Sequence, residues 1–453
     1  MKVLENNFEL NFNNNAFNFY NASDGIIPFV ISEILQNKKK IVIALSDNKY
    51  LKPFAKTLSA ITGINNILIF PSWDCFPYSD VSPSNYNINI RFKVLTKILF
   101  QQDDYKIIIT NFKNLTMLLP NKDEVVSNIF YLEKNKQYNL KDTINTLSSR
   151  GYNHVNLVLE PNEYAIRGGL VDIWPLGEQA PARLDFFGDT LESIKLFDPM
   201  SQISEKEKNS ISIFQNIEPP LSDTSKNDFI SNYRNYFGPS SNKDLFIHQL
   251  KEDKKLDGIE HWMPLFYKKK FISFFDFFDI EYLVFEHNLL NELEIFYKET
   301  IDAYSEKKEL ASTQIESTNQ PINPELLYLE QSLLSKQLNL IKKIEFSKFI
   351  SKKSNNYDLK ATDNIEKDIK VNSDEQLFRI LQTIVLKRTK KKIIFVADNE
   401  KNKEKLIFYI KNLFKNEEFI LRTNKSNFTE CFDDQEIVDI FIDNKIPPGD
   451  TVI

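Results

Sequence analysis

Between residues 38 and 120 the sequence alternates short apolar runs with amphipathic stretches, and this alternation strongly constrains the fold. The run KKKIVIAL (38–45) is typical of a buried strand, and Ser46 and Asp47 can cap a helix that follows it. The same reasoning predicts further strands at 67–70 and 106–110 and helices at 88–101 and 111–120. Alternating strands and helices indicate a parallel sheet with helices on its faces.

Parallel αβ domains often bind nucleotides, so we looked for a phosphate-binding loop before the first helix. The candidate is YNASDGIIPFVISEI (20–34), in which Gly25 is followed by Ile26, Ile27 and Pro28. A P-loop needs a lysine and a hydroxyl residue at such a turn to hold the phosphates and Mg²⁺. A phosphate cradle without its cation has little to bind a triphosphate. The sequence therefore predicts a degenerate nucleotide fold that uses no cofactor.

A different pattern fills residues 128–215, where a helix predicted at 141–151 is followed by strands that alternate with period two. In LVDIW (170–174) Val171 and Ile173 share one face. In RLDFFGD (183–189) the apolar partners are Leu184 and Phe186, whereas Arg183, Asp185 and Phe187 lie on the opposite face. The region is predicted to be a small α+β domain inserted after the first one.

Two arginines and a phenylalanine, Arg167, Arg183 and Phe187, are therefore expected on the outward face of this small sheet. One interpretation is surface ion pairing with Asp172, Asp185 or Glu192. The other is a protein-binding face, because arginine and aromatic side chains are common binding hot spots. In both cases we expect replacement of these exposed side chains to leave the stability of the fold nearly unchanged.

The remaining chain supports a division into five parts. Residues 1–127 and 216–350 lie on either side of the small domain at 128–215, a polar stretch at 351–372 is a linker or edge strands, and 373–453 is a second small αβ domain. Its predicted features include a capping box at Ser373 and Gln376. The run GDTVI at the end resembles an incomplete strand, which suggests an amino-terminal piece of a longer protein.

Composition and motifs exclude several classes of function. The net charge of −6, from 57 basic and 63 acidic residues, shows no basic excess that would indicate nucleic-acid binding. No signal peptide or membrane span is apparent, so we expect a cytoplasmic protein, in which Cys75 and Cys431 are free thiols. The four histidines have no metal-ligand spacing, and no catalytic constellation is present. Residues alone indicate a multidomain interaction protein without catalysis of its own.

Specific motifs take the interpretation further. PSWDCFPYSDVSPSNYNINIRFKVL (71–95) resembles a tryptophan- and proline-containing motif of the bacterial transcription-repair coupling factors (Mfd). GYNHVNLVLEPNEYAIRGGLVDIWPLGEQAPARLDFFGDTLESIKLFDPMSQIS (151–204) is similar to the domain that this family shares with UvrB. GIEHWMPLFY (258–267) resembles a third stretch of the family. The resemblance covers about residues 15–300 and weakens beyond 305.

The resemblance implies a degenerate P-loop (RecA-like) domain, split by an inserted UvrB-type domain and followed by a small αβ domain. It implies a protein that recruits UvrA to RNA polymerase stalled at DNA damage, with Arg167, Arg183 and Phe187 as the UvrA contacts. Contacts to RNA polymerase and double-stranded DNA, and the use of ATP and Mg²⁺, are implied only for downstream motor domains that this sequence lacks. UvrB itself, or another αβ ATPase or helicase fragment, is the alternative, although the intact P-loop of UvrB is missing here.

Overall fold

A computed structural model describes residues 16–20, 27–35, 40–62, 64, 66–100, 105–175, 178, 180–214, 218–238, 245–252, 256–313, 320–347, 356–358, 393–397, 404, 408, 420–423 and 437–442. The turn at 21–26, including Gly25 and Ile26, lies outside the described residues. So do the predicted capping box at Ser373 and Gln376, and Cys431.

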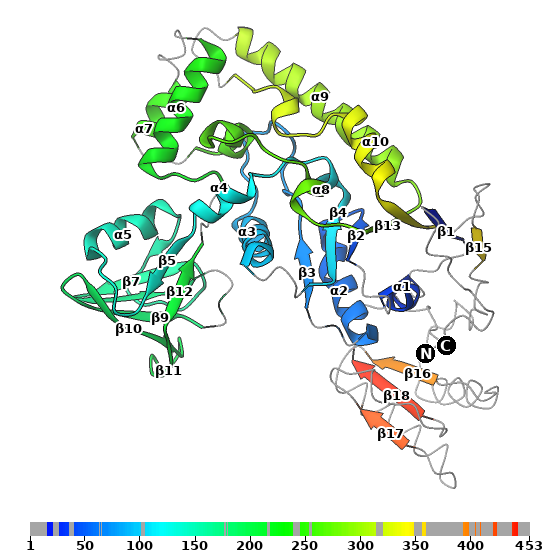
Figure 1. Cartoon of the computed structure of the whole chain (residues 1–453), viewed down its shortest axis with the longest axis horizontal. Coiled ribbons are helices and arrows are strands. Elements are labelled where there is room, and N and C mark those ends of the chain that lie inside the picture. Colours follow the sequence, from blue (N-terminus) through cyan, green and yellow to red (C-terminus); the bar gives the residue numbers. More distant parts are fainter. Residues whose placement is uncertain are drawn as a thin grey trace.

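Seven of the described strands form one sheet in the order β15-β1-β14-β13-β2-β4-β3, and every neighbouring pair in it is parallel. Four of them precede the small inserted domain: β1 (Ala16–Tyr20), β2 (Ile41–Leu45), β3 (Ile67–Phe70) and β4 (Ile107–Asn111). Three follow it: β13 (Tyr282–Glu286), β14 (Lys342–Phe346) and β15 (Asn356–Asp358). The predicted parallel sheet is confirmed, and segments far apart in sequence complete it (Figure 1).

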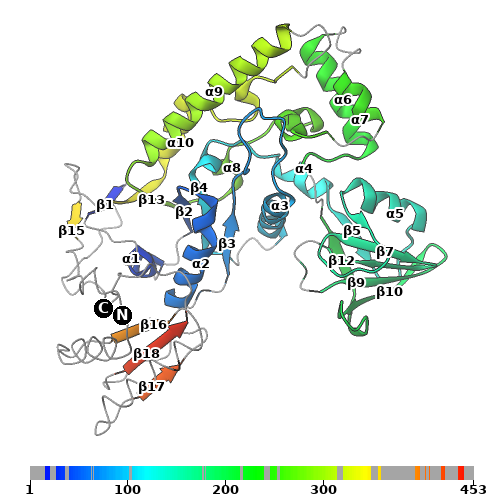
Figure 2. The same ribbon diagram turned by 180° about the vertical axis from the view of Figure 1, so that it is seen from behind.

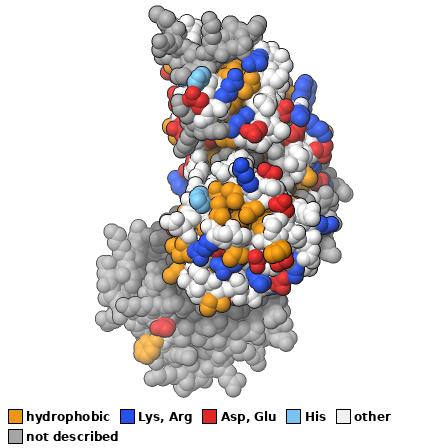
Figure 3. All heavy atoms as spheres, turned by 90° about the vertical axis from the view of Figure 1, so that its left-hand side faces the viewer, with side chains coloured by type: hydrophobic (Ala, Val, Ile, Leu, Met, Phe, Trp, Pro, Cys, Tyr) orange, Lys and Arg blue, Asp and Glu red, His pale blue; other side chains and the backbone are white. Residues whose placement is uncertain are grey.

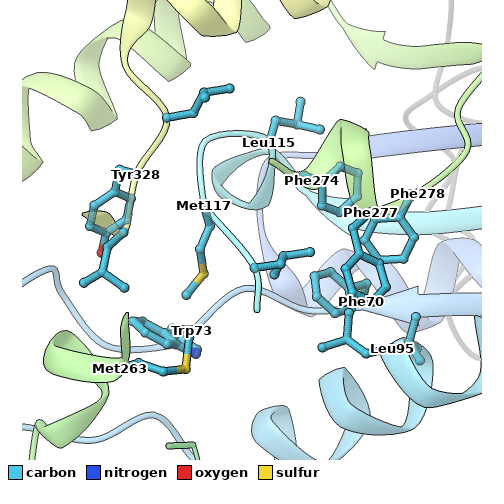
Figure 4. Packing of buried hydrophobic residues seen from close by; sticks show 14 of the residues in the cluster. Phe70, Trp73, Leu95, Leu115, Met117, Met263, Phe274, Phe277, Phe278 and Tyr328 are labelled. Carbon is cyan, nitrogen blue, oxygen red and sulfur yellow. The ribbon is translucent and has the colours of Figure 1, made fainter. Parts of the chain in front are cut away.

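The two faces of this sheet carry separate cores because side chains alternate along each strand. On one face Ile41 and Ile43 pack with helices α1 (Ile27–Leu35) and α2 (Asn48–Thr62). On the other face Val42 and Ala44 belong to a larger cluster that also includes residues of α3 (Asn85–Phe100), α8 (Phe274–Phe277), α9 (Leu289–Thr313) and α10 (Gln331–Leu340). Figure 4 shows the centre of that cluster, where aromatic side chains from distant segments meet. Most of the aromatic run at 273–285 therefore belongs to the core.

One helix prediction was wrong. The stretch NFKNLTMLLP forms only a 3-10 turn, η1 (Phe112–Leu115), which Asn111 caps by accepting a hydrogen bond from the Lys113 amide. Beyond the turn, Met117 and Leu119 enter isolated β-bridges with Tyr328 and Ile272. Pairing with two distant segments satisfies the backbone groups that a longer helix would have satisfied locally, so the helix does not continue.

The inserted domain is built on a six-stranded sheet in the order β11-β10-β9-β8-β7-β6, with a separate pair, β12 and β5, among the described residues. Its core lies between this sheet and helix α5 (Leu140–Ser149). In Figures 1 and 2 the domain stands to one side of the parallel sheet. Its strands are β5 (Phe130–Glu133), β6 (Asn153–His154), β7 (Glu163–Arg167), β8 (Leu170–Ile173), β9 (Ala182–Phe187), β10 (Thr190–Phe197), β11 (Ser204–Lys208) and β12 (Ser210–Ile213).

The remaining elements connect and extend these two units. Within the second predicted αβ domain, three described strands form a parallel sheet in the order β16-β18-β17. None of the helices that the structure describes is long and apolar enough to cross a membrane. The connecting elements are α4 (Lys122–Ser127), α6 (Asp223–Phe237), α7 (Leu245–Lys251), η3 (Ile259–Phe266) and η4 (Pro324–Leu326), and the three strands are β16 (Ile393–Ala397), β17 (Ile420–Thr423) and β18 (Ile437–Ile442).

Candidate functional site on the outward face of the inserted domain

The side chains of strand β9 alternate between the core and the outward face of the small sheet, as the sequence predicted. Leu184 and Phe186 are buried in the domain core, and Phe187 is 77% exposed on the other side. Arg183 and Asp185 share that side with Phe187 and are partly buried. The period of two thus places the predicted residues on one face.

Arg167 and Phe187 lie at the same end of this sheet. Arg167 ends β7 and is exposed, and the turn Gly168-Gly169 leads back into β8. Gly169 has no room for a side chain, because a Cβ atom there would lie 2.5 Å from the backbone oxygen of Phe186. This close approach fixes the turn after Arg167 against the end of β9, where Phe187 stands.

The strand register gives the spacing of the three predicted residues. Arg167 is opposite Leu170 on β8, and Leu170 is opposite Asp185 on β9. With strands about 4.8 Å apart and about 3.4 Å per residue, Arg167, Arg183 and Phe187 form a triangle with sides of about 12–14 Å. Leu170 lies inside it, and Asp185 lies on the side between Arg183 and Phe187. A triangle of this size fits comfortably within a standard protein–protein interface.

Arg183 is more constrained than the sequence suggested. Its Nε and Nη2 atoms donate to the two carboxylate oxygens of Asp172 at 2.7 and 2.9 Å, and Nη1 donates to the backbone oxygen of Gln202 at 3.3 Å. The guanidinium also lies over the Phe197 ring, 4.7 Å from its centre. The hydrogen bonds that Arg183 donates to Asp172 raise the pKa of Arg183 above its ordinary value. Only 20% of the Arg183 side chain and 3% of the Asp172 side chain are exposed.

The expectation that the whole outward face is wet therefore needs correction. Val158, Ala165 and Phe197 form a second small core on that side, with Val155 and Trp174 packed against it. The segment before β7 covers one part of the sheet and buries Asp172, which gives Arg183 an internal partner. Arg167 and Phe187 remain exposed. The open part of the face is therefore the end of the sheet that carries the turns at 168–169 and 188–189.

The tryptophan-containing motif has a structural role inside the first domain. Trp73 donates from Nε1 to a carboxylate oxygen of Glu218 at 2.7 Å, and Arg91 Nε lies 3.6 Å from the other oxygen. Arg91 is fully buried and also donates to Asn114 and to the backbone of Pro71. Burial lowers the pKa of Arg91, and the nearby Glu218 opposes that effect. This network connects the motif to the segment that leaves the inserted domain.

The third motif packs on the same loop. Tyr78 donates its backbone amide to His261 Nδ1 and its hydroxyl to the Ile322 oxygen, while Ser82 donates to Glu260. Burial raises the pKa of Glu260 to about 7 and lowers that of His261 to about 4. Both side chains are therefore neutral near pH 6. His261 is a packed residue, and the two motifs hold each other in place.

A small, mostly apolar hollow lies at the carboxyl ends of three strands of the parallel sheet. Ligands of parallel αβ sheets bind outside the carboxyl ends of the strands. There, the hollow is lined by the last residues of three strands, Leu45, Glu286 and Phe346, and by Ile27 from the first position of α1. The other lining residues are Ile43, Ala44, Phe54, Val284 and Phe285. No lysine or arginine contributes to this described lining, and Glu286 would repel a phosphate.

Other chemistry is sparse in the described part of the chain. No group of three histidine, cysteine or acidic residues in the described ranges could hold a metal ion. The Cys75 thiol is free, and burial raises its pKa to about 12, which makes it a poor nucleophile. The outward face of the inserted domain is therefore the best candidate for a functional site.

Comparison with known proteins supports that choice. A family model described as the UvrB interaction domain matches residues 130–218, so these residues form a domain of that type. Residues over 72% of the chain are 28% identical to the transcription-repair-coupling factor of Haemophilus influenzae, covering 28% of that protein. This chain is therefore similar to the amino-terminal region of the transcription-repair-coupling factors.

Further coupling factors agree with this relationship. The coupling factor of Escherichia coli is 29% identical over 47% of the chain and 18% of its own length. That of Borreliella burgdorferi is 32% identical over 41% of the chain and 16% of its own length. The matched region thus spans less than a third of each of these coupling factors. The resemblance found in the motifs is confirmed, while the roles of Arg167, Arg183 and Phe187 stay predictions.

Proposed function

We propose that this chain is a docking module of transcription-coupled nucleotide excision repair, which recruits UvrA through the outward face of its inserted domain. The observation that carries the proposal is the match of residues 130–218 to the UvrB interaction domain, together with the exposure of Phe187 and Arg167 on one end of its sheet. Exposed aromatic and arginine side chains on a rigid sheet are typical of binding hot spots.

Each of the three residues would have a distinct part in docking. Phe187 would supply apolar area, and Arg167 would supply a planar cation for a partner carboxylate. Arg183 would hold the face in shape through Asp172 and would present the remaining edge of its guanidinium. The partner surface should therefore be acidic beside an apolar pocket.

The first domain would serve as a scaffold without catalysis. We propose that it descends from a RecA-like P-loop fold that has lost its nucleotide, because its sheet is parallel and split by the insertion, and an apolar hollow with Ile27 stands at the nucleotide position. Contacts to RNA polymerase and double-stranded DNA, and ATP and Mg²⁺ chemistry, would belong to other parts of a full-length coupling factor. A UvrB-like or other ATPase fragment is the alternative, and nucleotide binding distinguishes the two.

The proposal is tested by titrating the full chain with UvrA from the same organism. Phe187→Ala should weaken binding by roughly 30-fold or more, since hot-spot truncations typically cost about 2 kcal/mol or more. Its melting curve should match that of the parent. A matched control is Phe76→Ala, which removes a similarly exposed phenylalanine from the first domain. Equal affinities of Phe187→Ala and the parent for UvrA would show that docking does not use this face.

A further inference from the structure

Two exposed apolar side chains stand on loops next to the covered part of the inserted domain. Met200, in the turn between β10 and β11, is 86% exposed, and Leu159, in the segment before β7, is 47% exposed. Both belong to the region that matches the UvrB interaction domain. Neither contributes to the domain core, so their apolar character needs another explanation.

One glutamine brings the two loops together. Gln202 Nε2 donates to the backbone oxygen of Val158 at 3.4 Å and to that of Pro199 at 2.7 Å. Leu159 and Met200 directly follow those two residues in the sequence. The exposed pair is therefore contributed by neighbouring loops that are hydrogen-bonded to a common side chain.

The same glutamine connects this pair to Arg183. Arg183 Nη1 donates to the Gln202 backbone oxygen, and the Arg183 guanidinium lies over Phe197, the last residue of β10. Arg183 thus lies between Phe187 at one end of β9 and the turn that carries Met200 at the other. Hydrogen bonds and a ring contact of Arg183 therefore connect β9 to the turn that carries Met200. Figure 3 views the molecule from the side of this domain, and hydrophobic side chains gather there between basic and acidic ones.

The turn that carries Met200 is held in one shape. A carboxylate oxygen of Asp198 accepts hydrogen bonds from the amides of Met200 at 3.1 Å and Ser201 at 2.7 Å. The backbone oxygen of Asp198 accepts a hydrogen bond from the Gln202 amide at 2.8 Å. Gln202 adopts a left-handed backbone conformation with φ of 60°. A pre-ordered loop loses little conformational entropy on binding, which favours its use as a contact.

We propose that Leu159 and Met200 form an apolar extension of the UvrA-docking face, separated from Phe187 by Arg183. This inference rests on the proposed function and adds a second contact region to it. The surface of UvrA that meets the extension should be apolar, because the two contributing side chains offer no charge. Methionine suits such a contact, since its flexible thioether adapts to an irregular partner surface.

UvrA is the occupant that the structure favours, because the extension is continuous with the end of the sheet that carries Arg167 and Phe187. The hydrogen bonds through Gln202 and Arg183 provide that continuity. A second copy of this chain is the other possible occupant, and sedimentation of the chain alone distinguishes it from UvrA.

The test compares five full-chain proteins for binding to UvrA: the parent, the double variant Leu159→Ser/Met200→Ser, Phe187→Ala, Arg167→Ala and a control. The double variant should bind roughly 10- to 100-fold more weakly, with an unchanged melting curve. Higher salt should leave the fold-change in affinity of the double variant unchanged, because an apolar contact is not screened. The loss of affinity caused by Arg167→Ala should become smaller at higher salt, because it removes a charge. The control Leu340→Ser removes an 82% exposed leucine at the end of α10, in the first domain, and should bind like the parent.

Each outcome decides a separate point. If the double variant binds like the parent while Phe187→Ala is weakened, the extension is wrong and the docking proposal stands. If both variants bind like the parent, the docking proposal fails as well. A loss of affinity in Leu340→Ser equal to that of the double variant would also overturn the inference, since the effect would not be local. A change in self-association of the double variant without a change in UvrA binding would assign the surface to a second copy of the chain.

Discussion

Replacement of Arg183 by alanine should destabilise the inserted domain, contrary to what an exposed position would predict. The variant leaves the carboxylate of Asp172, 3% exposed, without the two hydrogen bonds that it accepts at 2.7 and 2.9 Å. Removing one partner of a buried ion pair typically costs about 3–5 kcal/mol. Because the Arg183 side chain is 20% exposed and water can reach the site, we expect about 2–3 kcal/mol.

Hydrogen exchange followed by mass spectrometry can measure this loss within the domain. Peptides from β8 and β9 report opening of the strands that carry Asp172 and Arg183. A loss of about 2–3 kcal/mol corresponds to roughly 30- to 150-fold faster exchange when exchange follows the opening equilibrium. Phe187→Ala serves as the control on the same strand, and it should change the rates by less than about threefold, because surface replacements usually stay within about 0.5 kcal/mol.

A second substitution tests the cause. Asp172→Asn in the Arg183→Ala background removes the uncompensated charge, so the double variant should exchange more slowly than Arg183→Ala alone. The coupling in this double-mutant cycle should be at least about 1 kcal/mol. If Arg183→Ala exchanges like the parent, the ion pair does not support the sheet and the reasoning is refuted. If it is confirmed, a loss of UvrA binding in Arg183→Ala reports stability as well as contact, and Phe187 is the cleaner probe.

Three further predictions concern the rest of the chain. The full chain should neither bind nor hydrolyse Mg²⁺-ATP in calorimetric and phosphate-release assays, because apolar side chains line the nucleotide position; saturable binding would contradict this. Gly169→Ala should destabilise the inserted domain by roughly 2 kcal/mol or more in thermal unfolding, since its Cβ would meet the Phe186 backbone oxygen at 2.5 Å. Glu260, with a pKa raised to about 7, makes the unfolding free energy fall as pH rises from about 4.5 to 7. His261, with a pKa lowered from 6.5 to about 4, makes the unfolding free energy rise as pH increases from about 4 to 6.5. Denaturant titrations of Glu260→Gln should therefore show a steeper rise with pH than those of the parent, and an unchanged slope would exclude the role of Glu260.

Much of the fold could be predicted from the sequence because it depends on local periodicity. The runs around Ile41–Leu45 and Ile107–Asn111 became strands buried on both faces, since continuous apolar runs suit the middle of a parallel sheet. The structure of residues 111–120 could not be predicted from the sequence. In place of the expected helix, Met117 and Leu119 form β-bridges with residues more than 150 positions away. Local propensity carries no information about such distant partners.

The candidate site, too, could be predicted from the sequence only in part. The alternation of β9 placed Phe187 on the outward face, and this followed from the sequence alone. The partner of Arg183 did not, because Asp172, Asp185 and Glu192 were all compatible with the pattern. The strand register put Asp172 opposite Arg183, and the segment around Val158 buried it. Met200 had no sequence signal, since a lone methionine in a polar turn predicts nothing by itself.

The sequence by itself determined which residues alternate and which stretches form the central strands. These properties depend on neighbours within a few positions along the chain. The motif resemblance implied a first domain split by an insertion, but only the tertiary structure decided the order in which β1 to β4 and β13 to β15 pair in one sheet, and that Arg183 is an internal support as well as a surface group. The physical reason is that hydrogen-bond partners and burial depend on contacts between distant segments, which form only when the whole chain has folded.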